Sequence, residues 1–138
     1  MQIKREGQRR QLRWALLAMV ALAATGALTR SAAVAAEQLP PAAVKEADEI
    51  YKSRCTLCHG AAGKGDGPTA AALTPKPRTL TDAAWQKTVD DAHIEKIILN
   101  GGPSVGKSPL MPANPDLANK PDVIKALRQI VRQFGKPA

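Results

Sequence analysis

The sequence has very few aromatic side chains. Phenylalanine, tryptophan and tyrosine together make up 3% of its 138 residues, and after residue 36 only Tyr51, Trp85 and Phe134 remain. A domain of about 100 residues buries a modest fraction of its surface, and this one has few large side chains with which to do so. We therefore expect something other than aromatic side chains to help fill the core.

The chain also lacks an uncharged run long enough to span a membrane. Residues 14–28 carry no charge, but this run is 15 residues long, whereas a membrane-spanning helix needs about 20. A basic segment precedes it, and the small residues around Ala35 and Ala36 follow it, which is the layout of a secretory signal peptide. We predict a leader over residues 1–36, cleaved after Ala35 or Ala36, and export to the periplasm. An uncleaved leader, which would anchor the chain in the membrane, is the alternative.

The remainder of the chain lacks a strong charge of either sign. The full sequence has 20 basic and 12 acidic residues, but the predicted leader removes six of the basic ones and one acid, leaving a formal charge of +3. No basic stripe of the kind that binds nucleic acid is present. The 102 residues left are enough for one domain. We assign residues 37–41 to a short tether and residues 42–138 to that domain.

No segment alternates apolar and polar residues as a half-buried strand would, so we predict an all-α fold. Apolar residues recur at helical spacing over residues 42–57, and most clearly from Pro121 to Phe134. Two further helices are expected between these. One begins at Thr81 as its N-cap and runs through Trp85, and the other runs from Asp90 or Asp91 to Asn100.

Glycine and proline concentrate in two long segments. Residues 60–80 contain four glycines and three prolines, and residues 101–119 are similarly rich in both. Such a density of these residues prevents regular structure over most of each segment, although one turn is possible near residues 69–73. The predicted pattern is a first helix, a long irregular loop, two short helices, a second loop and a final helix.

The run Cys55-Thr56-Leu57-Cys58-His59 has the spacing of a covalent haem-attachment motif. Two thiols three residues apart can each add to one of the two vinyl groups at a haem edge, and the adjacent histidine can then bind the iron. Cys55 and Cys58 are the only cysteines in the chain, so two thioether bonds would leave no free thiol in an oxidising compartment. A covalently attached porphyrin would also supply the missing core volume.

Two other chemistries use a similar spacing. A redox-active dithiol of the thioredoxin type would require strands and helices in alternation, which the sequence does not predict. A structural zinc site needs four ligands, and Cys55, Cys58, His59 and His93 could provide them only with unusual spacing.

The second iron ligand has one main candidate. Met111 is the only methionine outside the predicted leader, and it lies in a loop with Pro109 and Pro112 on either side. A lone methionine often fills gaps in a core, but a proline-rich loop suits that role less well than a helix face does. Methionine and histidine together are a common set of haem ligands. His93, for which a surface position is the simpler interpretation, is the rival ligand.

With this motif, Met111 and the final amphipathic helix in order, the chain resembles class I c-type cytochromes. Within that family it is most similar to small bacterial monohaem proteins, on the run CHGAAGKGDGP from Cys58 to Pro68, and the resemblance covers about residues 42–135. It implies a small helical fold around one haem c, with His59 and Met111 as iron ligands. It also implies that the first and last helices cross, and that the carbonyl oxygen of Pro68 accepts the Nδ1 proton of His59 and so orients the ring.

The function that follows is transport of single electrons between redox proteins, by a monomer or by a subunit of a complex, without substrate chemistry. Arg78 and Trp85 are candidates to donate hydrogen bonds to a haem propionate, the alternatives being an exposed arginine and a core tryptophan. Exposed lysines are candidates to attract an acidic partner such as an oxidase, reductase or dehydrogenase, namely Lys64, Lys76, Lys107 and Lys120. If Met111 does not bind the iron, the alternative is a ligand-binding, sensor or peroxidase protein.

Overall fold

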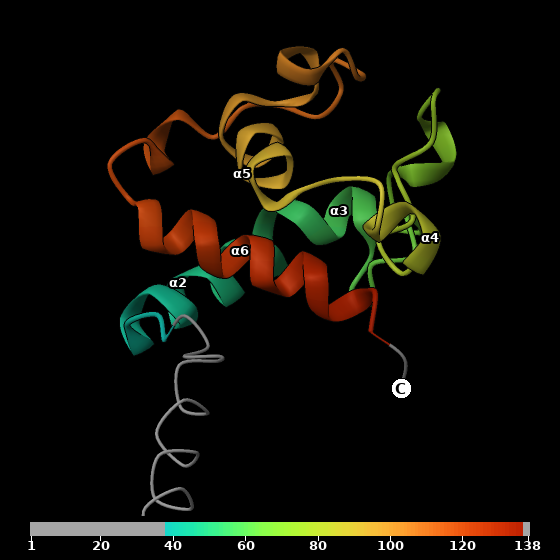
Figure 1. The fold of residues 1–138 in the computed structure, drawn as a ribbon. Helices are drawn as coiled ribbons and strands as arrows, with labels where there is room; N and C mark the ends of the chain where they lie inside the picture. Colours follow the sequence, from blue (N-terminus) through green and yellow to red (C-terminus); the bar gives the residue numbers. More distant parts are fainter. Residues whose placement is uncertain (1–37, 137–138) are drawn as a thin grey trace, which may run out of the picture. The chain divides into compact units, whose positions relative to one another are not determined.

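The first described helix begins at a pair of prolines. The computed structural model describes residues 38–136, and in it helix α2 spans Pro41–Ile50. Proline suits the first turn because an N–H there would have no partner within the helix. The helical path continues through a π-helical turn, Tyr51–Cys55, into α3, Thr56–His59 (Figure 1). The helix predicted to end at residue 57 therefore extends two residues further and includes the whole run from Cys55 to His59.

Two aspartates start the central helices. Helix α4 spans Ala83–Gln86, and the side chain of Asp82 accepts hydrogen bonds from the N–H groups of Ala84 and Trp85, both at 3.0 Å. The predicted N-cap, Thr81, is therefore wrong by one residue, since the aspartate carboxylate has taken that position. Helix α5 spans Asp91–Asn100 after Asp90, whose carboxylate accepts from the His93 N–H at 2.7 Å.

The last helix organises the core. Helix α6 spans Pro121–Phe134, as predicted, and packs against α2 and α5 (Figure 1). Its buried face includes Leu127, which contributes to a core that also contains the fully buried Leu117. The rings of Tyr51 and Phe134 meet with their centroids 5.4 Å apart, an aromatic contact where the first helical segment crosses α6. The predicted crossing of the first and last helices is thus present.

The fold class is all-α, since residues 38–136 contain no strand. The two glycine- and proline-rich segments carry only short 3₁₀ turns, at Ala70–Ala72, Gly102–Val105 and Pro115–Leu117. Across the described range, none of the helices combines the length and the apolar character needed to cross a membrane. The predicted signal peptide and the first residue of the predicted tether lie outside the described residues. The last tether residue, Pro41, already belongs to α2.

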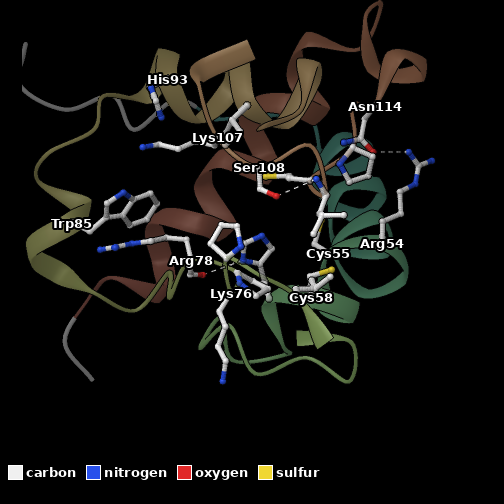
Figure 2. Close-up of a pocket in the computed structure, with 18 residues that line it drawn as sticks. Arg54, Cys55, Cys58, Lys76, Arg78, Trp85, His93, Lys107, Ser108 and Asn114 are labelled. Carbon is white, nitrogen blue, oxygen red and sulfur yellow. Dashed lines mark hydrogen bonds between the residues drawn. The ribbon is translucent and has the colours of Figure 1, made fainter. Parts of the chain in front are cut away.

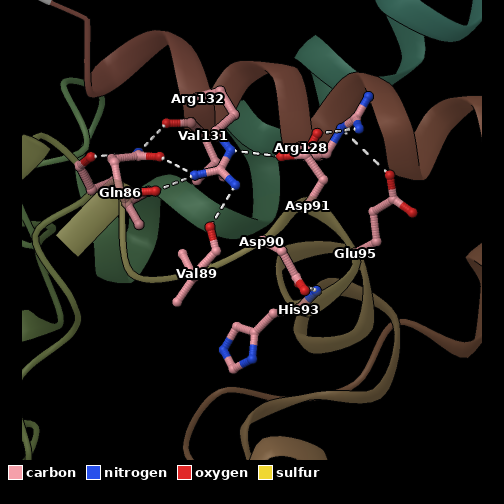
Figure 3. A network of polar contacts seen from close by, with 10 residues as sticks. Gln86, Val89, Asp90, Asp91, His93, Glu95, Arg128, Val131 and Arg132 are labelled. Atoms are coloured by element: carbon pink, nitrogen blue, oxygen red, sulfur yellow. Dashed lines mark hydrogen bonds and ion pairs between the residues drawn. The ribbon is translucent and has the colours of Figure 1, made fainter.

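A half-buried arginine of α6 fixes the connection between α4 and α5 (Figure 3). Arg132 donates to the backbone oxygen of Gln86 at 2.7 Å, to that of Val89 at 2.8 Å and to the Asp91 carboxylate at 2.8 Å. The Gln86 amide in turn donates to the Val131 carbonyl at 2.8 Å. Because α4 and α5 both contribute residues to the cavity described below, this network sets where those residues lie.

We expect Arg132→Ala to destabilise the fold by about 2 kcal/mol, because it leaves two backbone carbonyls without their charged donor and leaves Asp91 with Arg128 as its remaining guanidinium partner. The measurement is urea unfolding of the haem-loaded protein followed by circular dichroism. Gln133→Ala, at the adjacent exposed position of the same helix, controls for the change in helix composition and should leave the unfolding midpoint nearly unchanged. Equal midpoints for the two variants would contradict the importance of this network.

Candidate functional site

One cavity brings the predicted site residues together. It has a volume of about 360 Å³ and is lined by the end of the first helical segment, the loop before α4, Trp85, α5 and the second long loop (Figure 2). Six of the seven predicted residues line it, namely Cys55, Cys58, His59, Arg78, Trp85 and Met111. Pro68 does not, whereas the rival ligand His93 does.

The helical segment presents both thiols to this cavity. Cys55 ends the π-helical turn, and Cys58 follows three residues later in α3, a spacing that places two residues on the same helix face. Neither cysteine is in a disulfide. Burial raises the pKa of the Cys55 thiol to about 11, so this thiol is protonated at neutral pH. The pair is thus available for bonding to a group in the cavity.

His59 has the protonation state that a metal ligand requires. Its Nδ1 lies 3.1 Å from the carbonyl oxygen of Arg78. A carbonyl can only accept a hydrogen bond, so Nδ1 carries the proton and Nε2 keeps its lone pair. Burial lowers the pKa of His59, which favours the neutral ring. A hydrogen bond of this kind fixes the orientation of a ligating histidine.

The prediction that the Pro68 carbonyl accepts the Nδ1 proton of His59 is wrong, because the acceptor is the Arg78 carbonyl. After His59 the chain turns back along the helix end, with the Gly67 N–H bonded to the Cys58 carbonyl at 3.2 Å and the Thr69 N–H to the Leu57 carbonyl at 3.0 Å. This path carries Pro68 back alongside the helix. The chain returns to the histidine later, at Arg78.

Glycine permits this close return. A Cβ atom at Gly67 would lie 2.4 Å from the carbonyl oxygens of both Thr56 and Leu57, a distance that no side chain can tolerate. Gly65 has φ +74°, and a Cβ there would lie 2.6 Å from the Pro77 carbonyl oxygen. The sequence indicated only that these glycines interrupt regular structure. Their role in the structure is to let the loop pack against the backbone behind the cysteine–histidine motif.

Met111 lines the cavity from a loop held by its own backbone. Its carbonyl accepts from the Gly102 N–H at 2.9 Å, and its N–H donates to the Ser108 carbonyl at 3.2 Å. The Met111 side chain is partly buried, whereas its neighbour Leu110 is exposed. A thioether and a neutral imidazole therefore line the same cavity from separate parts of the fold.

The rim of the cavity is basic. Four cationic side chains line it, from Arg54, Lys76, Arg78 and Lys107, and no aspartate or glutamate does. The Arg78 guanidinium lies 5.1 Å from the centre of the Trp85 ring and donates to Asp82 at 2.5 Å. Arg78 and Trp85 thus form a pair at the rim, where they could meet an anionic group.

These residues fit a haem c. Two adjacent thiols, an imidazole with Nε2 free and a thioether line one cavity together with apolar side chains, and this donor set suits haem iron. The rival zinc site is not supported, because the described residues contain no group of three or more histidine, cysteine or acidic side chains able to hold a metal ion.

One residue at the site could not be identified from the sequence. Arg54 directly precedes Cys55 and lines the cavity, and its guanidinium donates to the side chains of Asn114 and Asp116. These partners lie 60 and 62 residues away in the sequence, so no local pattern connects them.

Comparison with known proteins agrees with this site. The family model described as cytochrome c oxidase, cbb3-type, subunit III matches residues 42–132. The cbb3-type cytochrome c oxidase subunit FixP of Azorhizobium caulinodans is 37% identical over 107 residues, which cover 77% of this chain and 32% of that subunit. The chain thus matches about a third of the length of this relative.

Among solved structures, the c-type cytochrome KustC0563 is 30% identical and matches with a TM-score of 0.49, over 64% of this chain and 95% of its own. The family match covers most of the described residues and includes the cysteine–histidine motif and Met111. The chain is therefore a class I c-type cytochrome and belongs to the family of cbb3-type cytochrome c oxidase subunit III.

Proposed function

We propose that this chain binds one haem c through thioether bonds to Cys55 and Cys58, and that His59 and Met111 are its iron ligands. The observation that carries the proposal is the convergence of these four side chains on one cavity. When bound, the haem supplies an iron that accepts and releases one electron. The protein side chains then have to hold the group, exclude competing ligands and present its edge to a partner.

Each ligand has a separate task in this proposal. His59 is oriented by the Arg78 carbonyl and kept neutral by burial, so its Nε2 can bind without first losing a proton. Met111 would be the second iron ligand, and its sulfur would leave no open position for oxygen or peroxide. A thioether ligand also favours the reduced state relative to a second histidine. These properties suit an electron carrier better than a catalyst.

The basic rim supports two further roles. Arg78 and Trp85, which pair where they line the cavity, would donate hydrogen bonds to a haem propionate. Lys76 and Lys107 line the cavity and remain candidates to attract an acidic partner, with an effect that weakens as salt concentration rises. Lys120 is a weaker candidate than the sequence suggested, because its ammonium pairs with Glu46 at 2.6 Å. Lys64 does not line the cavity.

We infer from the relationship to FixP that the electron acceptor is a terminal oxidase, and that this chain works as its electron-transfer subunit or as a separate carrier. On the basis of the predicted signal peptide we propose that the protein works in the periplasm, either free or held by the leader. Redox encounters of this type bury little surface and are weak, so a separate carrier would not need an extensive interface.

Absorption spectroscopy of the haem-loaded protein tests the proposal. A low-spin spectrum is expected, with a weak far-red band from the iron–sulfur bond in the oxidised form and no shift of the reduced spectrum under carbon monoxide. A high-spin spectrum that shifts with carbon monoxide would contradict the ligation by Met111. It would make a ligand-binding, sensor or peroxidase function the better explanation.

A further inference from the structure

The loop that carries Met111 is hydrogen-bonded to the C-terminal turn of α5 through Asn114. Asn114, three residues after Met111, donates its backbone N–H to the Leu99 carbonyl at 2.9 Å. Its side-chain amide donates to the Ile98 carbonyl at 2.7 Å. These two bonds use carbonyl groups in the last turn of α5, which have few partners within the helix. They fix both the backbone of Asn114 and the orientation of its amide group.

The side-chain oxygen of Asn114 is bonded to Arg54, in the helical segment that carries the two cysteines and His59. It accepts a hydrogen bond from Nη1 of Arg54 at 3.1 Å (Figure 2). The same guanidinium reaches Asp116, with Nη1 3.0 Å from Oδ1 and Nη2 2.9 Å from Oδ2. Arg54 therefore makes a bidentate ion pair with Asp116 and a third hydrogen bond to Asn114. Only a planar guanidinium can satisfy this arrangement.

The three hydrogen bonds of Arg54 connect the two chain segments that carry the proposed iron ligands. Arg54 directly precedes Cys55 in the helical segment that carries both cysteines and His59. Asn114 and Asp116 lie in the chain segment that follows Met111. The three contacts thus join the segment bearing the histidine ligand to the segment bearing the methionine ligand.

We propose that Arg54 is a positioning residue, which holds the Met111 loop closed against the haem-bearing helix and so keeps the methionine sulfur on the iron. This rests on the proposed ligation by Met111. A neutral thioether dissociates when its loop opens locally, and the cost of such opening depends on the contacts that the open loop loses. Three charge-assisted hydrogen bonds to one guanidinium add to that cost.

A second ion pair in the same fold serves as a matched control. Lys120 and Glu46 join α2 to the residue before α6 and are 46% and 39% exposed, against 45% and 49% for Arg54 and Asp116. Exposed pairs of this kind contribute little to global stability. The two pairs therefore resemble each other in exposure and in linking distant segments, but only the Arg54 pair is attached to the Met111 loop.

The test is titration of the oxidised, haem-loaded full-length protein with imidazole, which competes with Met111 for the iron. Arg54→Ala is expected to lower the apparent Kd for imidazole about fivefold, the effect of losing a contact of this strength. Asp116→Asn, which keeps the Asn114 contact, should give a smaller change in the same direction. The apparent Kd of Arg54→Lys for imidazole should lie between the values of Arg54→Ala and the unaltered protein. Glu46→Gln should leave this Kd unchanged.

Urea unfolding of the same variants separates positioning from global stability. Arg54→Ala and Glu46→Gln are expected to have similar unfolding midpoints while differing in imidazole affinity. The proposal is overturned if the two variants bind imidazole alike, or if Asp116→Asn has no effect and Arg54→Ala does not fold.

The unaltered protein distinguishes failure of this proposal from failure of the proposed function. If its far-red iron–sulfur band is absent, Met111 is not the ligand and both proposals fall. If the band is present in the unaltered protein and the imidazole affinity does not respond to Arg54→Ala, only the role of Arg54 is rejected.

Discussion

The double variant Cys55→Ala/Cys58→Ala is expected to contain no covalently bound haem. Each cysteine supplies one of the two proposed thioether bonds, and no other cysteine exists in the chain to replace them. The measurement is extraction with acidified acetone, which removes haem that is held only by its iron ligands. All of the haem should stay with the unaltered protein, and any haem in the double variant should pass into the organic phase.

Single variants refine this test. Cys55→Ala and Cys58→Ala should each keep one thioether bond, and the α band of the pyridine haemochrome should move to longer wavelength because one vinyl group remains unreacted. Leu57→Ala is the matched control, since Leu57 lies between the two cysteines and is 48% exposed. Covalent haem in the double variant would show that the attachment has been assigned wrongly.

Met111→Ala is expected to convert the iron site from six ligands to five. The far-red band should disappear, carbon monoxide should bind to the reduced protein, and the reduction potential should fall by on the order of 0.1 V or more, within the roughly 0.8 V range that axial ligands control. Loss of the thioether removes a ligand that favours the reduced state. Absorption spectra and a potentiometric titration measure all three effects.

Leu110→Ala provides the control for this loop. Leu110 is the neighbour of Met111, is 51% exposed and also lines the cavity, so its truncation alters the loop and the cavity wall without removing the sulfur. The far-red band should persist, and the reduced protein should still not bind carbon monoxide. Because His93 lines the same cavity, His93→Ala is the companion variant. If His93→Ala changes the spectrum while Met111→Ala does not, the histidine is the second ligand.

The residues that local sequence singled out as site candidates lie together in the structure. The cysteine spacing and the adjacent His59 form one motif, and the structure presents all three residues to one cavity. Helix α6 was predicted with its bounds at Pro121 and Phe134, because its apolar spacing, its first-turn proline and the following glycine all indicate the same element. Met111 stood out because the methionine lies in a proline-rich loop.

The error at the site concerns a contact between segments that are far apart in the sequence, and a second error is local. The acceptor of the His59 proton is the Arg78 carbonyl, 19 residues away, and any backbone carbonyl can fill that role. A residue's side chain therefore gives no sign of it, and the family pattern pointed instead to Pro68. The N-cap of α4 was misplaced by one residue because Thr81 and Asp82 are adjacent and both are suitable caps.

The sequence by itself determined the helical class and the side chains proposed to attach and bind a haem, since thiol spacing, ligand type and helix periodicity depend on residues that are close together along the chain. Only the tertiary structure decided how those groups are held. The carbonyl that orients His59, the Arg54 contacts to the Met111 loop and the Arg132 network all join segments between 19 and 62 residues apart. Such contacts form when helices pack, and the packing of a whole core, not any local pattern, brings them together.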